Sequence, residues 1–241
     1  MHSRLVTLPT AEQVYLNHLC DMLKLVTNNN LVGIYLLGSA SQGSYVAGES
    51  DLDVQMVVEQ PLCDAQKQAI IEMLSHSHLP CPATKLEFVV YHKAHLCNAQ
   101  SLHYSINFNT GRTLEQDYVS FDHSNDPRHW FLLDIAMAND WAISLSGEAF
   151  CHVFPNIEAP ILLQAMHECL TWFYQHYPDS KDCYQCASRI LSYLLRGVLV
   201  SKRQSLSELR LTDQWQSLPA QELVKSVLQD LEVKISHHNL S

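Results

Sequence analysis

Two aspartates in the first third of the chain have the type and spacing of a metal site. Asp51 and Asp53 flank Leu52 at the start of an apolar run. On a β-strand, residues i and i+2 point to the same face, so the two carboxylates would lie side by side. Such a pair is costly to desolvate unless a cation neutralises it, and oxygen ligands suit Mg²⁺ with phosphate oxygens completing its shell. The pair therefore predicts a magnesium site.

A phosphate-binding segment is predicted before this pair, at Gly38 and Ser39. Glycine permits close approach of the backbone, and serine with its neighbouring N–H groups can hold phosphate oxygens. The order along the chain is a buried strand, then Gly-Ser, then a polar loop, and then Asp-x-Asp at the start of a second apolar strand. This context favours a triphosphate and metal site over a surface turn with solvated acids.

A third carboxylate, Glu87, stands inside the apolar run Leu86 to Tyr91. Burying an unpaired charge is expensive, so a glutamate here needs a partner. If this strand lies beside the one that Asp51 opens, Glu87 faces the same site, as a general base or third metal ligand. The alternative is an edge strand with Glu87 facing water.

The elements that position these residues mix helices and strands. Thr10 to Val26 predicts a helix, with Thr10 and Gln13 as a capping box and the run of asparagines from Asn28 as its end. The pattern then predicts a strand over Leu31 to Leu37, a loop with room for a short helix over Gly38 to Ser50, a strand over Leu52 to Val58, a helix over Asp64 to Ser75 and a strand over Leu86 to Tyr91.

After Trp130 the periodicity becomes helical, and strands are hard to find. Helices are expected over Trp130–Ser146, Pro160–Tyr177, Cys183–Val200 and Pro219–Ser236. The simplest organisation is an α+β protein with an N-terminal α/β domain at 1–120 and a helical domain at 121–241. The boundary itself is expected between Gly111 and Pro127.

Composition narrows the partners. The chain has 241 residues, of which 47% are hydrophobic and 17% charged, and a net charge of -10. A globular chain with this negative charge is a poor candidate for general binding of nucleic acids or anionic membranes, and a better candidate for binding cations. The apolar runs are too short to span a bilayer, and no signal peptide is recognisable, so we expect a cytoplasmic protein. Among the eight cysteines, Cys183 and Cys186 form the only close pair, and packing explains them better than zinc.

The motifs resemble a known group of enzymes. Gly38-Ser39 with Asp51-x-Asp53 resembles the signature of the polymerase β-like nucleotidyltransferase superfamily. Three stretches are similar to bacterial aminoglycoside adenylyltransferases of the streptomycin/spectinomycin type: Leu31 to Tyr91, Trp130 through Gly147, and Arg189 through Gly197 and Ser201-Lys202.

The resemblance implies a mixed sheet with flanking helices, followed by a helical bundle. It implies transfer of AMP from ATP to a hydroxyl of an aminoglycoside, with Mg²⁺ as cofactor and pyrophosphate as product. Asp51, Asp53 and Glu87 match the acidic site, with Glu87 as the base or a third ligand. Residues matching nucleotide contacts are Gly38, Ser39, Ser50, Arg189 and Lys202. Without the resemblance, Arg189 and Lys202 would be ordinary helix-surface and helix-terminal residues.

The substrate side of the resemblance rests on Trp172 and the loop from Asp179 to Asp182. Carboxylates there would pair with amino or guanidino groups, and the indole would pack on a sugar or a cation. Asp179 or Asp182 would also serve as the N-cap of the next helix. We therefore expect a small, cationic, hydroxylated substrate and a monomer, with no nucleic acid or membrane as partner.

The chain also departs from the best-known members. It has Phe108 to Arg112 where they carry a tryptophan, and Gln185 where they carry a histidine. These departures concern the streptomycin or spectinomycin specificity and leave the transfer chemistry intact. Two other interpretations also stay open. One is a nucleotidyltransferase acting on a different small molecule, a protein or an RNA, and the other is an inactive nucleotide-binding homologue.

Overall fold

The computed structural model describes residues 7–209 and 219–238. The chain divides into two compact units. The sheet unit comprises Met1–Pro127 and Ala138–Asn156, and the helical unit comprises Arg128–Met137 and Ile157–Ser241. Within the described ranges, no helix has the length and apolar character that a membrane span requires.

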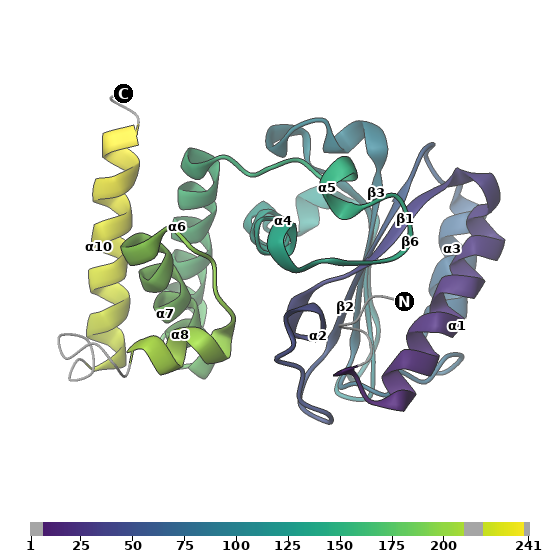
Figure 1. The fold of residues 1–241 in the computed structure, drawn as a ribbon, viewed down its shortest axis with the longest axis horizontal. Helices are drawn as coiled ribbons and strands as arrows, with labels where there is room; N and C mark the ends of the chain where they lie inside the picture. Colours follow the sequence, from purple (N-terminus) through teal and green to yellow (C-terminus); the bar gives the residue numbers. More distant parts are fainter. Residues whose placement is uncertain (1–6, 210–218, 239–241) are drawn as a thin grey trace. The chain divides into compact units, whose positions relative to one another are not determined.

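A mixed six-stranded sheet forms the centre of the sheet unit (Figure 1). The strand order is β5-β4-β3-β2-β1-β6, and β2 and β3 run parallel whereas the other neighbours are antiparallel. The strands predicted from the sequence at β1, β2 and β3 are confirmed. The bounds are β1 Leu31–Leu36, β2 Leu52–Val58, β3 Leu86–His92, β4 Tyr104–Thr110, β5 Tyr118–Ser120 and β6 Ile143–Gly147.

Two helices, α1 (Thr10–Thr27) and α3 (Asp64–Leu74), cover one face of the sheet (Figure 1). Their apolar side chains and every second strand residue form one hydrophobic core, because alternate strand residues point to the same face. The largest fully buried members include Leu16, Leu19 and Leu23 of α1, Ile70 of α3, and Leu52, Met56 and Phe88 of the strands. This burial holds β2 and β3 in place.

The start of α1 differs from the prediction. Thr10 is the first helical residue, Pro9 precedes it, and no side chain caps the helix. The predicted capping box is therefore wrong. Pro9 already has the φ that a helix entry accepts, -58°, and the Gln13 amide donates instead to the carbonyl oxygen of Leu8 at 2.6 Å. The predicted break holds, since Asn28 follows the helix at a φ of 51°.

The helical pattern expected over Trp130–Ser146 is wrong at its end. Helix α4 (Arg128–Trp141) stops, and β6 pairs antiparallel with β1, with Leu36 opposite Ile143 and Gly33 opposite Gly147. Local periodicity did not reveal this strand, because the open edge of β1 decides it. The expected division near residue 120 places β6 in the helical domain, whereas β6 belongs to the sheet.

Among the residues that the structure describes, the helical unit contains four further helices of eight residues or more. Those expected over 160–177, 183–200 and 219–236 are confirmed with shifted ends. Helix α10 packs on α6 and α7, and α7 packs on α6 and α8. Helix α7 begins after Ser180, whose hydroxyl accepts a hydrogen bond from the Cys183 amide at 3.1 Å. The bounds are α6 Ala159–His176, α7 Lys181–Arg196, α8 Lys202–Leu209 and α10 Ala220–His238.

Short helices complete the description. They are α2 Gly38–Gln42, α5 Phe150–Val153, and the 3₁₀ turns η2 Asn28–Asn30, η3 Lys93–Leu96, η4 Ala99–Ser101 and η5 His123–Asn125. Helix α5 packs on the second face of the sheet, where the ring of Phe150 lies 5.4 Å from that of Tyr35.

Candidate active site

The parallel pairing of β2 with β3 brings the predicted acidic residues together. Asp53 lies opposite Glu87, and the Leu52 amide donates to the Lys85 carbonyl oxygen at 3.0 Å, which places Asp51 beside Lys85. Because alternate residues share a face, the four side chains lie on the face opposite the α1 and α3 core. The sequence left the position of Glu87 open, and the register resolves it in favour of the acidic site.

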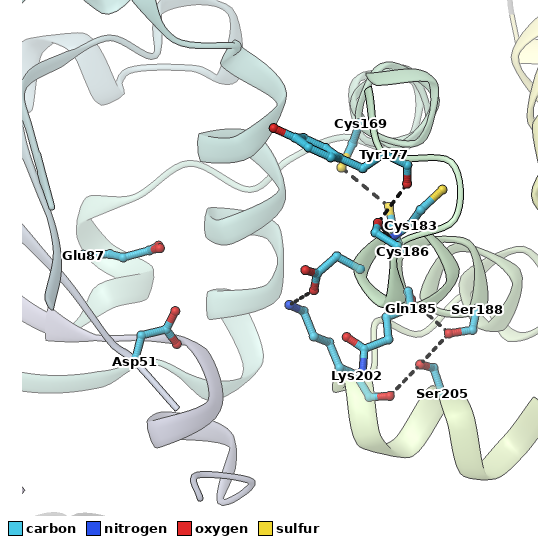
Figure 2. A network of polar contacts seen from close by, with 12 residues as sticks. Asp51, Glu87, Cys169, Tyr177, Cys183, Gln185, Cys186, Ser188, Lys202 and Ser205 are labelled. Atoms are coloured by element: carbon cyan, nitrogen blue, oxygen red, sulfur yellow. Dashed lines mark hydrogen bonds and ion pairs between the residues drawn. The ribbon is translucent and has the colours of Figure 1, made fainter. Parts of the chain in front are cut away.

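The three carboxylates form a compact group. One oxygen from each of Asp51, Asp53 and Glu87 lies within 4.8 Å of the others, and all three residues are half-buried. The carboxylates of Asp51 and Glu87 project from the same side of the strands (Figure 2). Among the described residues, this is the one group of three or more potential metal ligands. An all-oxygen donor set fits Mg²⁺, so the residues present suit the ion expected from the sequence.

Gly38 brings the end of β1 directly against Asp53. The Leu37 amide donates to the Asp53 carbonyl oxygen at 2.8 Å, and Gly38 has a φ of +61°. A Cβ atom on Gly38 would lie 1.7 Å from Asp53 Oδ2. Only glycine permits this approach. The next residue, Ser39, has a buried hydroxyl with no hydrogen-bond partner among the described residues, so its bonding capacity remains for a ligand.

Ser50 has a structural contact instead of an open hydroxyl. Its Oγ accepts a hydrogen bond from the Val46 amide at 3.0 Å. Its carbonyl oxygen accepts from the Thr84 amide at 3.0 Å and from the Thr84 hydroxyl at 3.1 Å. Ser50 thereby ties the loop before β2 to the segment before β3 and positions Asp51. Its contact with a nucleotide stays a prediction.

Sequence reasoning missed Lys85. Its ammonium pairs with Glu87 Oε1 and lies 3.8 Å from Asp51 Oδ2. Burial alone would lower the pKa of Lys85, but Glu87, then Asp51 and Asp53, outweigh burial and raise it. A signal was present, because Lys85 precedes Glu87 by two residues, and a strand places such residues on one face.

Two uncharged residues extend the polar face. Asn109 of β4 lies opposite Glu87 in the sheet register. Gln55, two residues after Asp53, is 3% exposed, and its Oε1 has no hydrogen-bond partner among the described residues. Neither residue was singled out from the sequence, since amides in strands carry no local signature.

In the helical unit, two predicted residues pair with each other. Lys202 Nζ lies 3.3 Å from Asp182 Oδ1, the contact drawn from Lys202 in Figure 2. Arg189 is half-buried, its Nε donates to the Val200 carbonyl oxygen at 3.2 Å, and burial lowers its pKa. Lys202 begins α8, so the alternative of a lysine at a helix C-terminus is wrong. The phosphate contacts expected for both cations stay predictions.

The predicted substrate residues lie on neighbouring elements of the same unit. Trp172 stacks on His176 with ring centroids 4.7 Å apart and meets Trp130 edge-on at 5.3 Å. Asp179 accepts a hydrogen bond from the Gln221 amide at 2.7 Å. Because Ser180 caps α7, the alternative of Asp179 or Asp182 as the N-cap is wrong. Their contact with a substrate remains a prediction.

Cysteines of the helical unit pack, as expected. Cys169 and Cys183 are buried, and the sulfur of Cys169 lies 3.6 Å from that of Cys186 (Figure 2). Within the described ranges, no group of three or more metal ligands includes a cysteine.

Comparison with known proteins finds a match in fold and none in sequence family. No known family profile and no curated protein matches the sequence. Among solved structures, the spectinomycin adenyltransferase AAD(9) from Enterococcus faecialis, determined with ATP and spectinomycin, is similar with a TM-score of 0.64 and 14% identity. The match covers 91% of this chain and 98% of that chain. The chain shares the fold of that adenyltransferase.

The shared fold, with its mixed sheet and flanking helices, confirms the α+β class predicted from the sequence. A second solved structure, a STING-associated CdnE c-di-GMP synthase from Capnocytophaga granulosa, matches with a TM-score of only 0.28 and 13% identity, over 97% of this chain and 84% of that chain. At 14% identity the first likeness establishes the fold alone, so any conclusion about chemistry depends on the acidic residues of the central strands β2 and β3.

Proposed function

We propose that this chain transfers AMP from ATP to a hydroxyl group of a small, cationic, aminoglycoside-like molecule and releases pyrophosphate. The observation that carries the proposal is the β2–β3 register, which places Glu87 beside Asp53 and next to Asp51. The shared fold with an adenyltransferase determined with ATP and spectinomycin supports it.

The acidic group would hold magnesium. Asp51 and Asp53 would be its ligands, with Glu87 as a third or as the base. When bound, Mg²⁺ supplies positive charge that stabilises the charge developing on the phosphates during transfer. Gly38 and Ser39 would position the triphosphate, because the glycine lies against Asp53 and the serine hydroxyl is unpartnered within the described residues.

Glu87 would act on the acceptor. Its carboxylate takes the proton of the acceptor hydroxyl, the oxygen forms a bond to the α-phosphorus, and the bond from that phosphorus to pyrophosphate breaks. Arg189 and Lys202 of the helical unit would neutralise the leaving pyrophosphate, since charge-assisted hydrogen bonds to phosphate are strong.

A cationic acceptor fits the charge of the chain. The net charge is -10, and two of its acids, Asp179 and Asp182, lie exposed near the start of α7. Trp172, half-buried on α6, offers a ring face for a sugar or a cation. The same proposal includes a monomeric enzyme working in the cytoplasm, where ATP is plentiful.

Pyrophosphate release tests the proposal. The assay contains ATP and Mg²⁺, with streptomycin or spectinomycin added separately, and compares the wild type with Asp53→Ala. Asp117→Ala, at an exposed aspartate of the sheet unit outside the site, is the matched control. We expect release that requires a drug and Asp53 and that survives the control substitution.

Two other outcomes have definite meanings. ATP binding without release in either drug would retain the nucleotide site and reject these acceptors. Release that persists above a few per cent in Asp53→Ala would contradict the metal assignment. The Glu87→Gln variant separates the roles further, since a base can be removed without loss of ATP binding, whereas a metal ligand cannot.

A further inference from the structure

The ammonium of Lys85 lies within the acidic group, beside the carboxylates that would also bind a metal ion. Its ammonium contacts Glu87, lies 3.8 Å from Asp51, and is influenced by the charge of Asp53. Its side chain is 28% exposed, so water screens these contacts only in part. The same oxygens that offer a divalent ion its ligands therefore already face a cation supplied by the chain.

The backbone of Lys85 is fixed, so any adjustment must come from its side chain. Its carbonyl oxygen accepts the Leu52 amide at 3.0 Å. On the other side, a Cβ atom on Gly111 would lie 2.4 Å from Lys85 Cα, which shows how closely the next strand's end packs against it. A lysine side chain has a flexible stem of four carbons, and its ammonium can therefore leave the carboxylates while its backbone stays in place.

The ammonium of Lys85 is a like charge for any metal ion that binds the acidic group. It lies against Glu87 and 3.8 Å from Asp51, so a divalent ion binding there would meet it at short range. A neighbouring cation within about 4–6 Å lowers the proton affinity of a carboxylate by about tenfold to a thousandfold, and the same repulsion acts on a metal ion. An ammonium in this position must therefore weaken the binding of a metal ion that arrives alone.

We propose that Lys85 is a built-in counter-ion of the acidic group that competes with the divalent ion for Asp51 and Glu87. The ammonium neutralises these carboxylates in the metal-free protein and leaves them when the metal binds. A triphosphate provides the displaced ammonium with a new anionic partner, so metal and nucleotide bind cooperatively. This inference rests on the proposed function, because it takes the acidic group as a metal site, and it adds an order of binding to it.

Mn²⁺ titration without nucleotide tests the competition directly. Free Mn²⁺ is measured by its electron paramagnetic resonance signal for the wild type, Lys85→Met and Lys85→Gln. We expect both variants to bind Mn²⁺ about tenfold more tightly or better. Lys93→Met is the matched control, because Lys93 also pairs with two acids, Glu59 at 3.1 Å and Glu148 at 3.6 Å, but lies outside the site. It should leave the Mn²⁺ affinity unchanged.

Thermal unfolding provides a second readout. Without metal, Lys85→Met should melt at a lower temperature than the wild type, since Asp51 and Glu87 then lose the ammonium that lies beside them. Saturating Mn²⁺ should remove that difference. Equal or weaker Mn²⁺ binding by variants that still unfold cooperatively would overturn the proposal.

Wild-type protein keeps the test decisive if both variants fail to fold. Its Mn²⁺ affinity is then compared with and without a non-hydrolysable ATP analogue, and equal affinities would overturn the proposal. The outcome is separable from the proposed function. Drug-dependent pyrophosphate release with unchanged Mn²⁺ affinity in the variants rejects the role of Lys85 alone, whereas tighter Mn²⁺ binding without any transfer rejects the proposed reaction and retains the competition.

Discussion

The two faces of strands β2 and β3 carry different chemistry on the same backbone. One face presents Leu52, Met56 and Phe88, all fully buried beneath α1 and α3. The other presents Asp53 and Glu87 with their neighbours, half-buried and within reach of one another. Strand alternation thus assigns stability to one set of residues and a candidate site to the next. Substitutions on the buried face should therefore change stability and leave metal binding largely intact, and substitutions on the acidic face should do the opposite.

Glu12, a carboxylate on the side of the sheet covered by α1 and α3, shows what distinguishes the two faces. Glu12 of α1 is 3% exposed and accepts a hydrogen bond from the Tyr45 hydroxyl at 2.8 Å. Burial, and then the bond to Glu12, raise the pKa of Tyr45, so its hydroxyl stays protonated and donates. Glu12 has a neutral donor in the core, whereas Glu87 has a cation and two more acids at the surface. The surroundings decide whether the same group serves packing or chemistry.

The largest expected effect is on the site face. Asp53→Asn should reduce nucleotidyl transfer about 1000-fold, since the charge that holds the metal supplies several kcal/mol of transition-state stabilisation. Its melting temperature should be unchanged or higher, because one of three mutually repelling carboxylates is gone. Pyrophosphate release and thermal unfolding measure the two properties. A parallel loss of stability would show that the faces are not independent.

The matching substitution on the buried face is at Phe88, the residue next to Glu87. Phe88→Ala removes a fully buried ring from the core and should lower the free energy of unfolding by about 3–5 kcal/mol. Urea denaturation measures that loss. The folded variant should retain the Mn²⁺ affinity of the wild type, and a tenfold loss of affinity would contradict the separation of the two faces.

Gly38→Ala tests the close approach to Asp53. A non-glycine residue at its φ of +61° costs about 1–2 kcal/mol, and the new Cβ must displace the Asp53 carboxylate. Gly43→Ala is the matched control, because its φ is +73° but nothing lies within 4 Å of its Cβ. Gly38→Ala should lose at least as much stability as Gly43→Ala, and only Gly38→Ala should lose Mn²⁺ and ATP affinity. Equal affinities by calorimetry would argue against Gly38 as part of the site.

The last comparison concerns two tyrosine hydroxyls and affects stability alone, without an expected change in metal or ATP affinity. Tyr45→Phe removes the donor to Glu12 and should cost about 1–3 kcal/mol in the free energy of unfolding. Tyr35→Phe is the control on the other face, since its buried hydroxyl has no hydrogen-bond partner among the described residues. It should be neutral or stabilising. Chemical denaturation measures the free energy of unfolding of both variants. Equal losses of that free energy would show that the Glu12 contact contributes little.

The sequence alone determined the local features of the site. Apolar runs predicted β1, β2 and β3, and Asp51 and Asp53 were identified as a pair because strand periodicity is a property of neighbouring residues. Gly38 stood out because few residues adopt its conformation or permit such close approach. The α+β class followed from the change of periodicity along the chain.

Only the tertiary structure decided which distant residues meet. The parallel register sets Glu87 opposite Asp53, places Lys85 among the acids and adds Asn109 from the next strand. The strand β6 exists because the edge of β1 accepts it, although its segment follows a helix. These outcomes depend on pairing between segments far apart in sequence, and local periodicity contains no information about such partners.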